Sequence, residues 1–141
     1  MIGWDILALG RRAAGERFER GRFWQTIRMH RQGRLQWTER TRLEGGDALL
    51  DSPVGLSGDP VFGCLWAAGP AVAGCDIDAL RAELDAGGTP AAITRIESDL
   101  LVARALGRGT AEVRAELGAL WCALRPRLTG VPARAPRLWA T

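Results

Sequence analysis

The side chains that most often carry enzyme chemistry are sparse and scattered in this sequence. There is one histidine, His30, and the three cysteines, Cys64, Cys75 and Cys122, lack the spacing of metal ligands. The chain contains no lysine, so its glycine-rich stretches cannot form a phosphate-binding P-loop, and no nucleophile elbow is present. We therefore expect a binding or scaffolding protein without a tightly bound cofactor, and not an enzyme.

Paired carboxylates do occur in the sequence, at Asp76/Asp78 and at Glu112/Glu116. Both pairs fall in the first turns of predicted helices, where negative charge complements the helix dipole. This placement favours a structural role for them over acid–base catalysis.

Charge is distributed unevenly along the chain. All cationic residues are arginines, and the net charge of +3 is divided into +4 over residues 1–50, −5 over residues 51–124 and +4 over residues 125–141. The two basic segments could meet an acidic partner or a nucleic acid. The alternative is that they form an ordinary solvated surface.

Residues 22–43 show the clearest secondary-structure pattern in the chain. Apolar and polar side chains alternate there with a period of two, which is typical of half-buried strands. Gln32 and Gly33 divide the segment into two strands. The pattern predicts a β-hairpin.

The pairing register of this hairpin should keep apolar side chains on one face. A two-residue loop would place Met29 opposite Gln36, whereas a three-residue loop over residues 31–33 places Met29 opposite Leu35. The longer loop also puts Gly33 at the left-handed position that such hairpins need. We therefore predict the three-residue loop.

The other face of the predicted hairpin is strongly basic. Its members include Arg22, Trp24, Arg28, Arg40 and Arg42. The predicted register sets Trp24 opposite Arg40, which would allow a cation–π contact. Because like charges across a strand pair destabilise it unless something covers them, this face is a candidate partner-binding surface. The alternative is a surface tryptophan packed against arginine stems.

The rest of the chain alternates short strands with two helices. We predict strands over residues 4–9, 61–66, 92–96 and 100–106, and helices over residues 77–86, capped by Asp76, and 111–124, capped by Thr110. Pro126 should end the second helix, because proline cannot donate its backbone hydrogen bond. The order predicts a β-rich α+β fold of antiparallel strands and hairpins, with both helices in the C-terminal half.

Length and cysteine content indicate one small domain. A chain of 141 residues can bury a core, and three cysteines do not make a disulfide framework. The longest uncharged run, residues 60–75, is too short for a membrane span. We therefore expect a cytoplasmic protein with reduced thiols that pack as small apolar residues, and no membrane partner.

Three segments, taken in order, resemble a known family. They run from Trp4 to Glu16, from Leu56 to Gly63, and from Leu120 to the C-terminal Pro-Arg-Leu-Trp-Ala-Thr. Their order and spacing are similar to those of the urease accessory protein UreD family, also called UreH. The resemblance covers residues 1–141 and implies a single UreD-like C-terminal region that lacks the family's N-terminal half.

This resemblance implies a function in urease maturation. It implies a chaperone that binds the urease apoprotein and the accessory proteins UreF and UreG, and that helps the GTPase UreG to load nickel into the urease active site. It also implies that Glu16, and less strongly Asp5, line a path for nickel in transit. The alternative for Glu16 is a turn glutamate paired with a neighbouring arginine.

Two other interpretations remain open at this stage. One is an arginine-rich β-module that binds nucleic acid, whose affinity should fall steeply with salt. The acidic middle segment opposes it, and Trp24 is the one evident stacking side chain, so nucleic acid is not the expected partner. The other is a non-functional truncated remnant of a UreD gene.

Overall fold

The chain forms two compact units. The computed structural model describes residues 1–140, without the side chains of Ala13, Leu138 and Ala140. Unit 1 comprises residues 1–8 and the chain from residue 60 onward, and unit 2 comprises residues 9–59. Each unit is described separately below.

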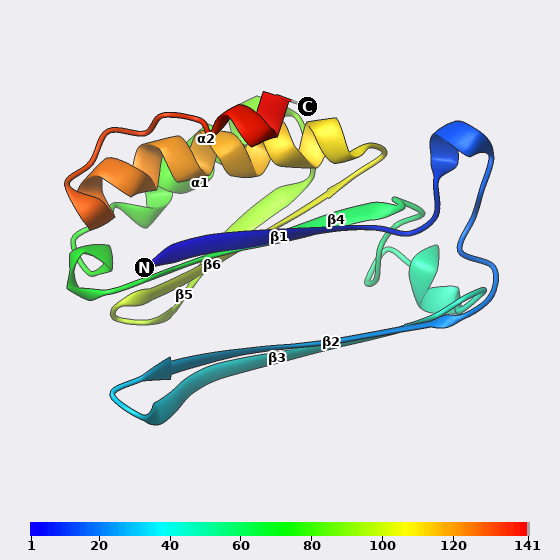
Figure 1. Ribbon diagram of the computed structural model, residues 1–141, viewed down its shortest axis with the longest axis horizontal. Coiled ribbons are helices and arrows are strands. Elements are labelled where there is room, and N and C mark those ends of the chain that lie inside the picture. Colours follow the sequence, from blue (N-terminus) through cyan, green and yellow to red (C-terminus); the bar gives the residue numbers. More distant parts are fainter. Residues whose placement is uncertain (141) are drawn as a thin grey trace. The chain divides into compact units, whose positions relative to one another are not determined.

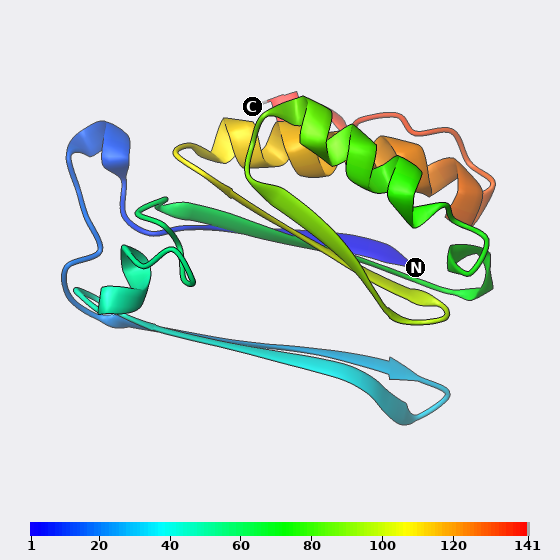
Figure 2. The ribbon, with the colours of Figure 1, turned by 180° about the vertical axis from the view of Figure 1, so that it is seen from behind.

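Unit 1 is a four-stranded antiparallel sheet covered on one face by two helices (Figures 1 and 2). The strands are β1 (Ile2–Ala8), β4 (Val61–Ala68), β5 (Ala91–Glu97) and β6 (Leu100–Gly107), in the order β1-β4-β6-β5. The helices are α1 (Ile77–Gly87) and α2 (Thr110–Thr129). With the separate hairpin of unit 2, this arrangement confirms the predicted β-rich α+β fold, with small shifts in strand bounds.

The core of unit 1 lies between the sheet and the helices. Its fully buried apolar side chains include Leu65, Leu101, Val113, Leu117, Leu120 and Leu124. Gly63 of β4 lies where α2 crosses the sheet, and a Cβ at this position would come within 2.7 Å of Val113 Cγ1 and of Leu117 Cδ1. Strand and helix can therefore approach this closely because residue 63 has no side chain.

Helix α2 is longer than the sequence predicted. The expected stop near Leu124 is wrong, because the helix continues through Pro126 to Thr129. Cys122, the residue whose carbonyl loses a partner to Pro126, is exposed, so water can replace the missing donor. The Pro126 carbonyl still accepts the Gly130 N–H, at 2.9 Å. The predicted cap is also wrong, since Gly109 is the N-cap and makes no side-chain capping bond.

The three cysteines form no disulfide within the described residues, and they lie in two kinds of environment. Cys64 and Cys75 are buried, which confirms that they pack as small apolar residues, whereas Cys122 is exposed. The prediction that all three are packing residues is therefore wrong for Cys122, which lies on the outer side of α2.

The C-terminal segment returns to unit 1 through a stack of tryptophans. It ends in η4 (Arg137–Ala140), a short 3-10 helix. The ring centroid of Trp139 lies 4.4 Å from that of Trp4 in β1 and 4.9 Å from that of Trp121 in α2. Aromatic pairs at these distances add to the stability gained from burial. The last element is thus fixed to the first strand and to the last helix.

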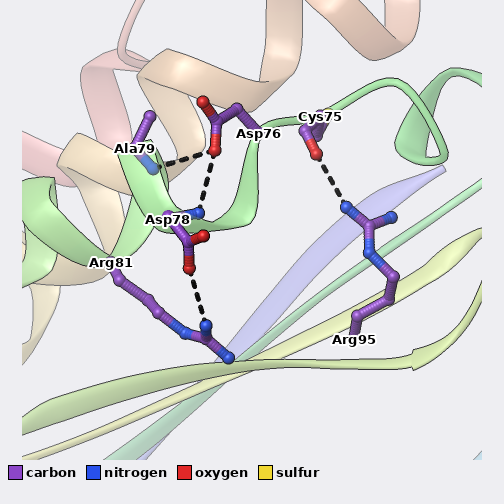
Figure 3. A network of polar contacts seen from close by, with 6 residues as sticks. All are labelled: Cys75, Asp76, Asp78, Ala79, Arg81 and Arg95. Carbon is purple, nitrogen blue, oxygen red and sulfur yellow. Dashed lines mark hydrogen bonds and ion pairs between the residues drawn. The ribbon is translucent and has the colours of Figure 1, made fainter.

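Helix α1 begins with the cap that the sequence predicted. Asp76 Oδ1 accepts the backbone N–H groups of Asp78 at 3.0 Å and of Ala79 at 3.1 Å (Figure 3). These bonds satisfy donors that the first turn leaves free. They set the start of the helix at Ile77.

An arginine of the sheet holds the segment that leads into α1. Arg95 of β5 donates from Nη2 to the Cys75 carbonyl at 2.7 Å, the contact drawn in Figure 3. It also donates from Nη1 to the carbonyls of Val72, at 2.8 Å, and of Ser98, at 3.2 Å. One guanidinium thus ties the edge strand to the turn η3 (Pro70–Val72) and to the start of α1.

Unit 2 contains the predicted hairpin, formed by β2 (Arg22–Arg31) and β3 (Arg34–Glu44). The short 3-10 helices η1 (Arg12–Ala14) and η2 (Ala48–Leu50) flank it in sequence. The predicted three-residue loop is wrong, because Arg31 pairs with Arg34 and the turn consists of Gln32 and Gly33. Both turn residues have positive φ, 51° and 76°, as a tight hairpin turn of two residues requires.

A β-bulge corrects the mismatch that argued against the short turn. His30 pairs with Leu35 but Met29 pairs with Trp37, so Gln36 is an extra residue on β3. One added residue reverses the face of every following side chain. Beyond the bulge, Phe23 therefore pairs with Leu43, and the apolar residues share one face.

One carboxylate of unit 1 is largely shielded from solvent where α2 meets the end of α1. Glu116 of α2 is 5% exposed, and its carboxylate packs against Gly87, where any side chain would collide with it. No hydrogen bond reaches this carboxylate from residues 1–140. Burial raises the pKa of the Glu116 carboxyl above its ordinary value of 4.5.

We expect Glu116→Gln to stabilise the chain at pH 7 by about 1 kcal/mol, because a neutral amide costs less to desolvate than a carboxylate. The raised pKa in the folded state means that folding favours the protonated acid. Stability from this group is complete below pH 4.5 and is lost as the pH rises through the raised value. The gain should therefore shrink toward pH 4.5, as measured by urea unfolding of both chains at the two pH values.

Glu112→Gln is the matched control for this prediction. Glu112 lies one turn earlier, is exposed, and accepts the Arg108 N–H at 3.0 Å. We expect its replacement to lower stability slightly at pH 7. A gain for Glu116→Gln that did not vary with pH would contradict the assignment.

Candidate functional site

The exposed face of the β2–β3 hairpin gathers the residues that the sequence singled out as a partner-binding surface. We call this face the arginine face, and it consists of Arg22, Trp24, Arg28, Arg40 and Arg42. All five residues are exposed, while the intervening residues on the other face are half-buried or buried. The alternation of the two strands therefore positions them together, and their role in binding stays a prediction.

Trp24 is the apolar centre of the arginine face, with 67% of its surface exposed. The expected pairing of Trp24 with Arg40 is wrong, because the bulge shifts the register and sets Trp24 opposite Arg42. Arg42 Cζ lies 5.5 Å from the Trp24 ring centroid, within the range of a cation–π contact. Arg40 lies opposite Thr26 instead.

Glu44 closes one end of the arginine face, and the sequence analysis missed it. Its Oε1 lies 2.5 Å from Arg42 Nη2 and 3.5 Å from Arg22 Nε. The hydrogen bond from Arg42 lowers the pKa of the Glu44 carboxyl below its usual range. Arg28 and Arg40 form no ion pair with any of residues 1–140. The sequence could have indicated Glu44, since it continues the alternation of the two faces one residue beyond the predicted strand.

Glu16, the first candidate for a nickel contact, is held by its own loop. Arg11 binds it with two bonds, from Nη2 to Oε1 at 2.5 Å and from Nε to Oε2 at 2.9 Å. This pair lowers the pKa of the Glu16 carboxyl. The carboxylate is exposed and ionised, and a metal ion would have to compete with Arg11 for both oxygens.

Asp5, the second candidate, lies in the middle of β1 in unit 1, whereas Glu16 belongs to unit 2. The register places Asp5 beside Cys64 of β4 and Cys64 beside Arg104 of β6. Asp5 thus shares a row across the sheet with a basic side chain. Within residues 1–140, the structure shows no group of three or more metal-ligating side chains.

Comparison with known proteins shows the family to which the chain is similar. A family model described as UreD urease accessory protein matches residues 1–140. The chain belongs to the UreD family. The UreD protein of Pseudomonas fluorescens (strain Pf-5) is 46% identical over 139 residues, which cover 98% of this chain and 48% of that protein. The UreD protein of Nitrosococcus oceani is 45% identical over 141 residues, which cover 100% of this chain and 47% of that protein. The UreD protein of Pseudomonas aeruginosa PAO1 is 44% identical over 140 residues, which cover 98% of this chain and 48% of that protein.

The match confirms the resemblance drawn from the three sequence segments. This UreD chain spans about half the length of the curated relatives that it matches. Those relatives are named as urease accessory proteins. In the part of the chain that the structure describes, no helix is both long and apolar enough to cross a membrane.

Proposed function

We propose that this UreD chain acts as a chaperone in urease maturation. In this proposal it binds the urease apoprotein together with UreF and UreG, and it supports the GTP-dependent incorporation of nickel into the urease active site. Membership of a family named for urease accessory proteins is the observation that carries the proposal. Nickel is the cargo of this process, and the protein works in the cytoplasm.

The arginine face is the surface that we propose for docking a partner. Arg28 and Arg40 are exposed cations without ion pairs in residues 1–140, and Trp24 offers a large exposed ring between charged neighbours. Arginine and tryptophan are the residue types that most often dominate binding energy at protein interfaces. An acidic patch on a partner would neutralise the uncompensated charge.

Glu16 and Asp5 are the carboxylates that we propose for transient contacts with nickel. Carboxylate oxygens hold a divalent ion without the tight thiolate or imidazole ligation that would trap it. The pair with Arg11 gives Glu16 a competing partner, which favours weak and reversible binding.

The proposal predicts that reversing charge on the arginine face will break the complex. The tagged chain, co-expressed with its cognate urease subunits, UreF and UreG, should co-purify with at least one of them at moderate salt. Arg28→Glu combined with Arg40→Glu should reduce the amount of recovered partner about tenfold, because two attractive contacts become repulsive. The measurement is the partner-to-bait ratio after affinity purification.

Arg12→Glu combined with Arg17→Glu is the matched control, because these exposed arginines of unit 2 lie outside the hairpin. We expect the control to retain the partners. Equal losses of recovered partner in both variants would refute the proposed docking surface. Failure of the parent chain to recover any partner would refute the proposed function.

Nucleic-acid binding is the second candidate function, and the arginine face with its exposed Trp24 favours it. It predicts an affinity for single-stranded DNA that falls steeply as salt is raised, because phosphate contacts release counterions. A folded chain that ignored all urease partners and bound DNA in this way would favour the second candidate.

A further inference from the structure

The end of unit 1 is rich in arginine. Residues 125–140 contain no Asp or Glu, and they contain four arginines, which we call the C-terminal arginine cluster: Arg125, Arg127, Arg134 and Arg137. None of them forms an ion pair with any of residues 1–140, and the last three are exposed. The segment after α2 turns back alongside this helix to η4 (Figures 1 and 2). The cluster is therefore carried by two neighbouring stretches of chain.

Arg125 is fixed in place by aromatic packing. Its Cζ lies 4.8 Å from the centroid of the Trp121 ring. Trp121 is itself buried and is held by the edge-on ring of Trp139. A guanidinium stacked on a fixed ring has already lost much of its rotamer freedom, so binding a ligand costs it less entropy.

The hydrogen bonding of Arg125 is incomplete. Its Nε is buried and has no acceptor among residues 1–140. A buried donor without an acceptor costs free energy, which a small shift onto an incoming acceptor would recover. A carboxylate is suited to this role, because it can accept two parallel bonds from one guanidinium.

The charge of the rest of unit 1 limits what the cluster can bind. Outside the cluster, unit 1 carries nine acidic side chains against five arginines. A long polyanion would extend over this acidic surface and be repelled by it. A short acidic segment would contact the cluster alone.

We propose that the C-terminal arginine cluster binds a short acidic segment of a protein partner, with one carboxylate received by Arg125. The surface belongs to unit 1, whereas the arginine face belongs to unit 2. The inference therefore stands apart from the proposed docking on the arginine face and can be tested without the urease proteins.

The test measures binding of a fluorescein-labelled hexaglutamate peptide by anisotropy at low salt. Arg127→Gln, Arg134→Gln and Arg137→Gln combined should weaken binding about tenfold, because three attractive charges are lost. The matched control removes the same charge from unit 2 with Arg12→Gln, Arg17→Gln and Arg20→Gln, which are exposed and lie outside the hairpin. It should change the affinity less than about twofold, because these residues belong to neither proposed surface.

Arg125→Lys tests the stacked guanidinium without changing net charge. Lysine lacks the planar fork, so affinity should fall about threefold or more if Arg125 receives a carboxylate. A circular dichroism spectrum and a urea midpoint of each variant verify that the fold is retained.

Three results would overturn the proposal. They are absence of hexaglutamate binding by the parent chain, equal losses in the cluster and control variants, and tighter binding of a labelled twelve-nucleotide oligothymidine with the same dependence on the cluster. The last result would assign the cluster to a nucleic acid instead.

Discussion

Gly63→Ala is expected to lower the free energy of unfolding by about 1–3 kcal/mol, although alanine is the better residue in a strand. The new methyl group would lie 2.7 Å from both Val113 Cγ1 and Leu117 Cδ1, and 3.3 Å from the Asp5 carbonyl oxygen. Both side chains are fully buried and have no free space to move into. Strand β4 and helix α2 must separate, and urea unfolding of the variant measures the cost.

Gly118→Ala is the matched control, because the same methyl group is added on α2 at an ordinary distance of 3.7 Å from Trp4. There we expect a gain of about 0.5–1 kcal/mol from helix propensity. Leu117→Ala alone should cost about 2–5 kcal/mol through the cavity that it leaves.

The double variant Gly63→Ala/Leu117→Ala should cost less than the two single losses together, because each change relieves the other. Additive losses would show that residue 63 and Leu117 are not in steric conflict. That result would contradict the close approach.

Arg95→Met should destabilise the chain by about 2–4 kcal/mol, because its three hydrogen bonds to carbonyl groups are lost together. The carbonyls of Val72 and Cys75 are partly buried, so water replaces the guanidinium poorly. The stability of Arg95→Lys should fall between those of the parent chain and Arg95→Met, because an ammonium group keeps the charge but cannot span both carbonyls. Urea unfolding at pH 7 measures these differences.

Arg81 supplies the control for this prediction. It bonds Asp78 three residues earlier at 2.8 Å and is half exposed, so Arg81→Met should change stability by less than about 0.5 kcal/mol. If Arg81→Met and Arg95→Met had equal effects, charge alone would explain both, and the bridging role of Arg95 would be refuted.

The hairpin shows where prediction from sequence succeeds and where it stops. Alternation located both strands and the arginine face, because a period of two is a property of the strand itself. The register depends on whether Gln36 is paired or bulged. The alternation of apolar and polar residues does not show which of the two occurs. Local periodicity therefore fixed the faces but not the cross-strand pairs.

The same limit explains what was missed at the candidate site. The pair of Trp24 with Arg42 and the clamp of Glu44 on two arginines both follow from the true register. Glu116 was predicted to be in a first helical turn, yet it is buried, because its depth depends on how α1 meets α2. Helix α2 continues beyond Pro126, because the missing hydrogen bond falls at an exposed position where water can replace it.

Residues 9–59 interrupt a pair of strands that are neighbours in space. Ala8 ends β1 directly opposite Val61, the start of β4, so the two strands could be joined by a tight turn if the intervening residues were removed. The hairpin unit is thus an insertion into a β-hairpin of the other unit. Because the entropy of closing a loop grows only slowly with its length, such an insertion can be lengthened, shortened or exchanged at little cost to its host. Evolution and protein engineering can therefore alter the arginine face as a module while the sheet and its helices keep their sequence.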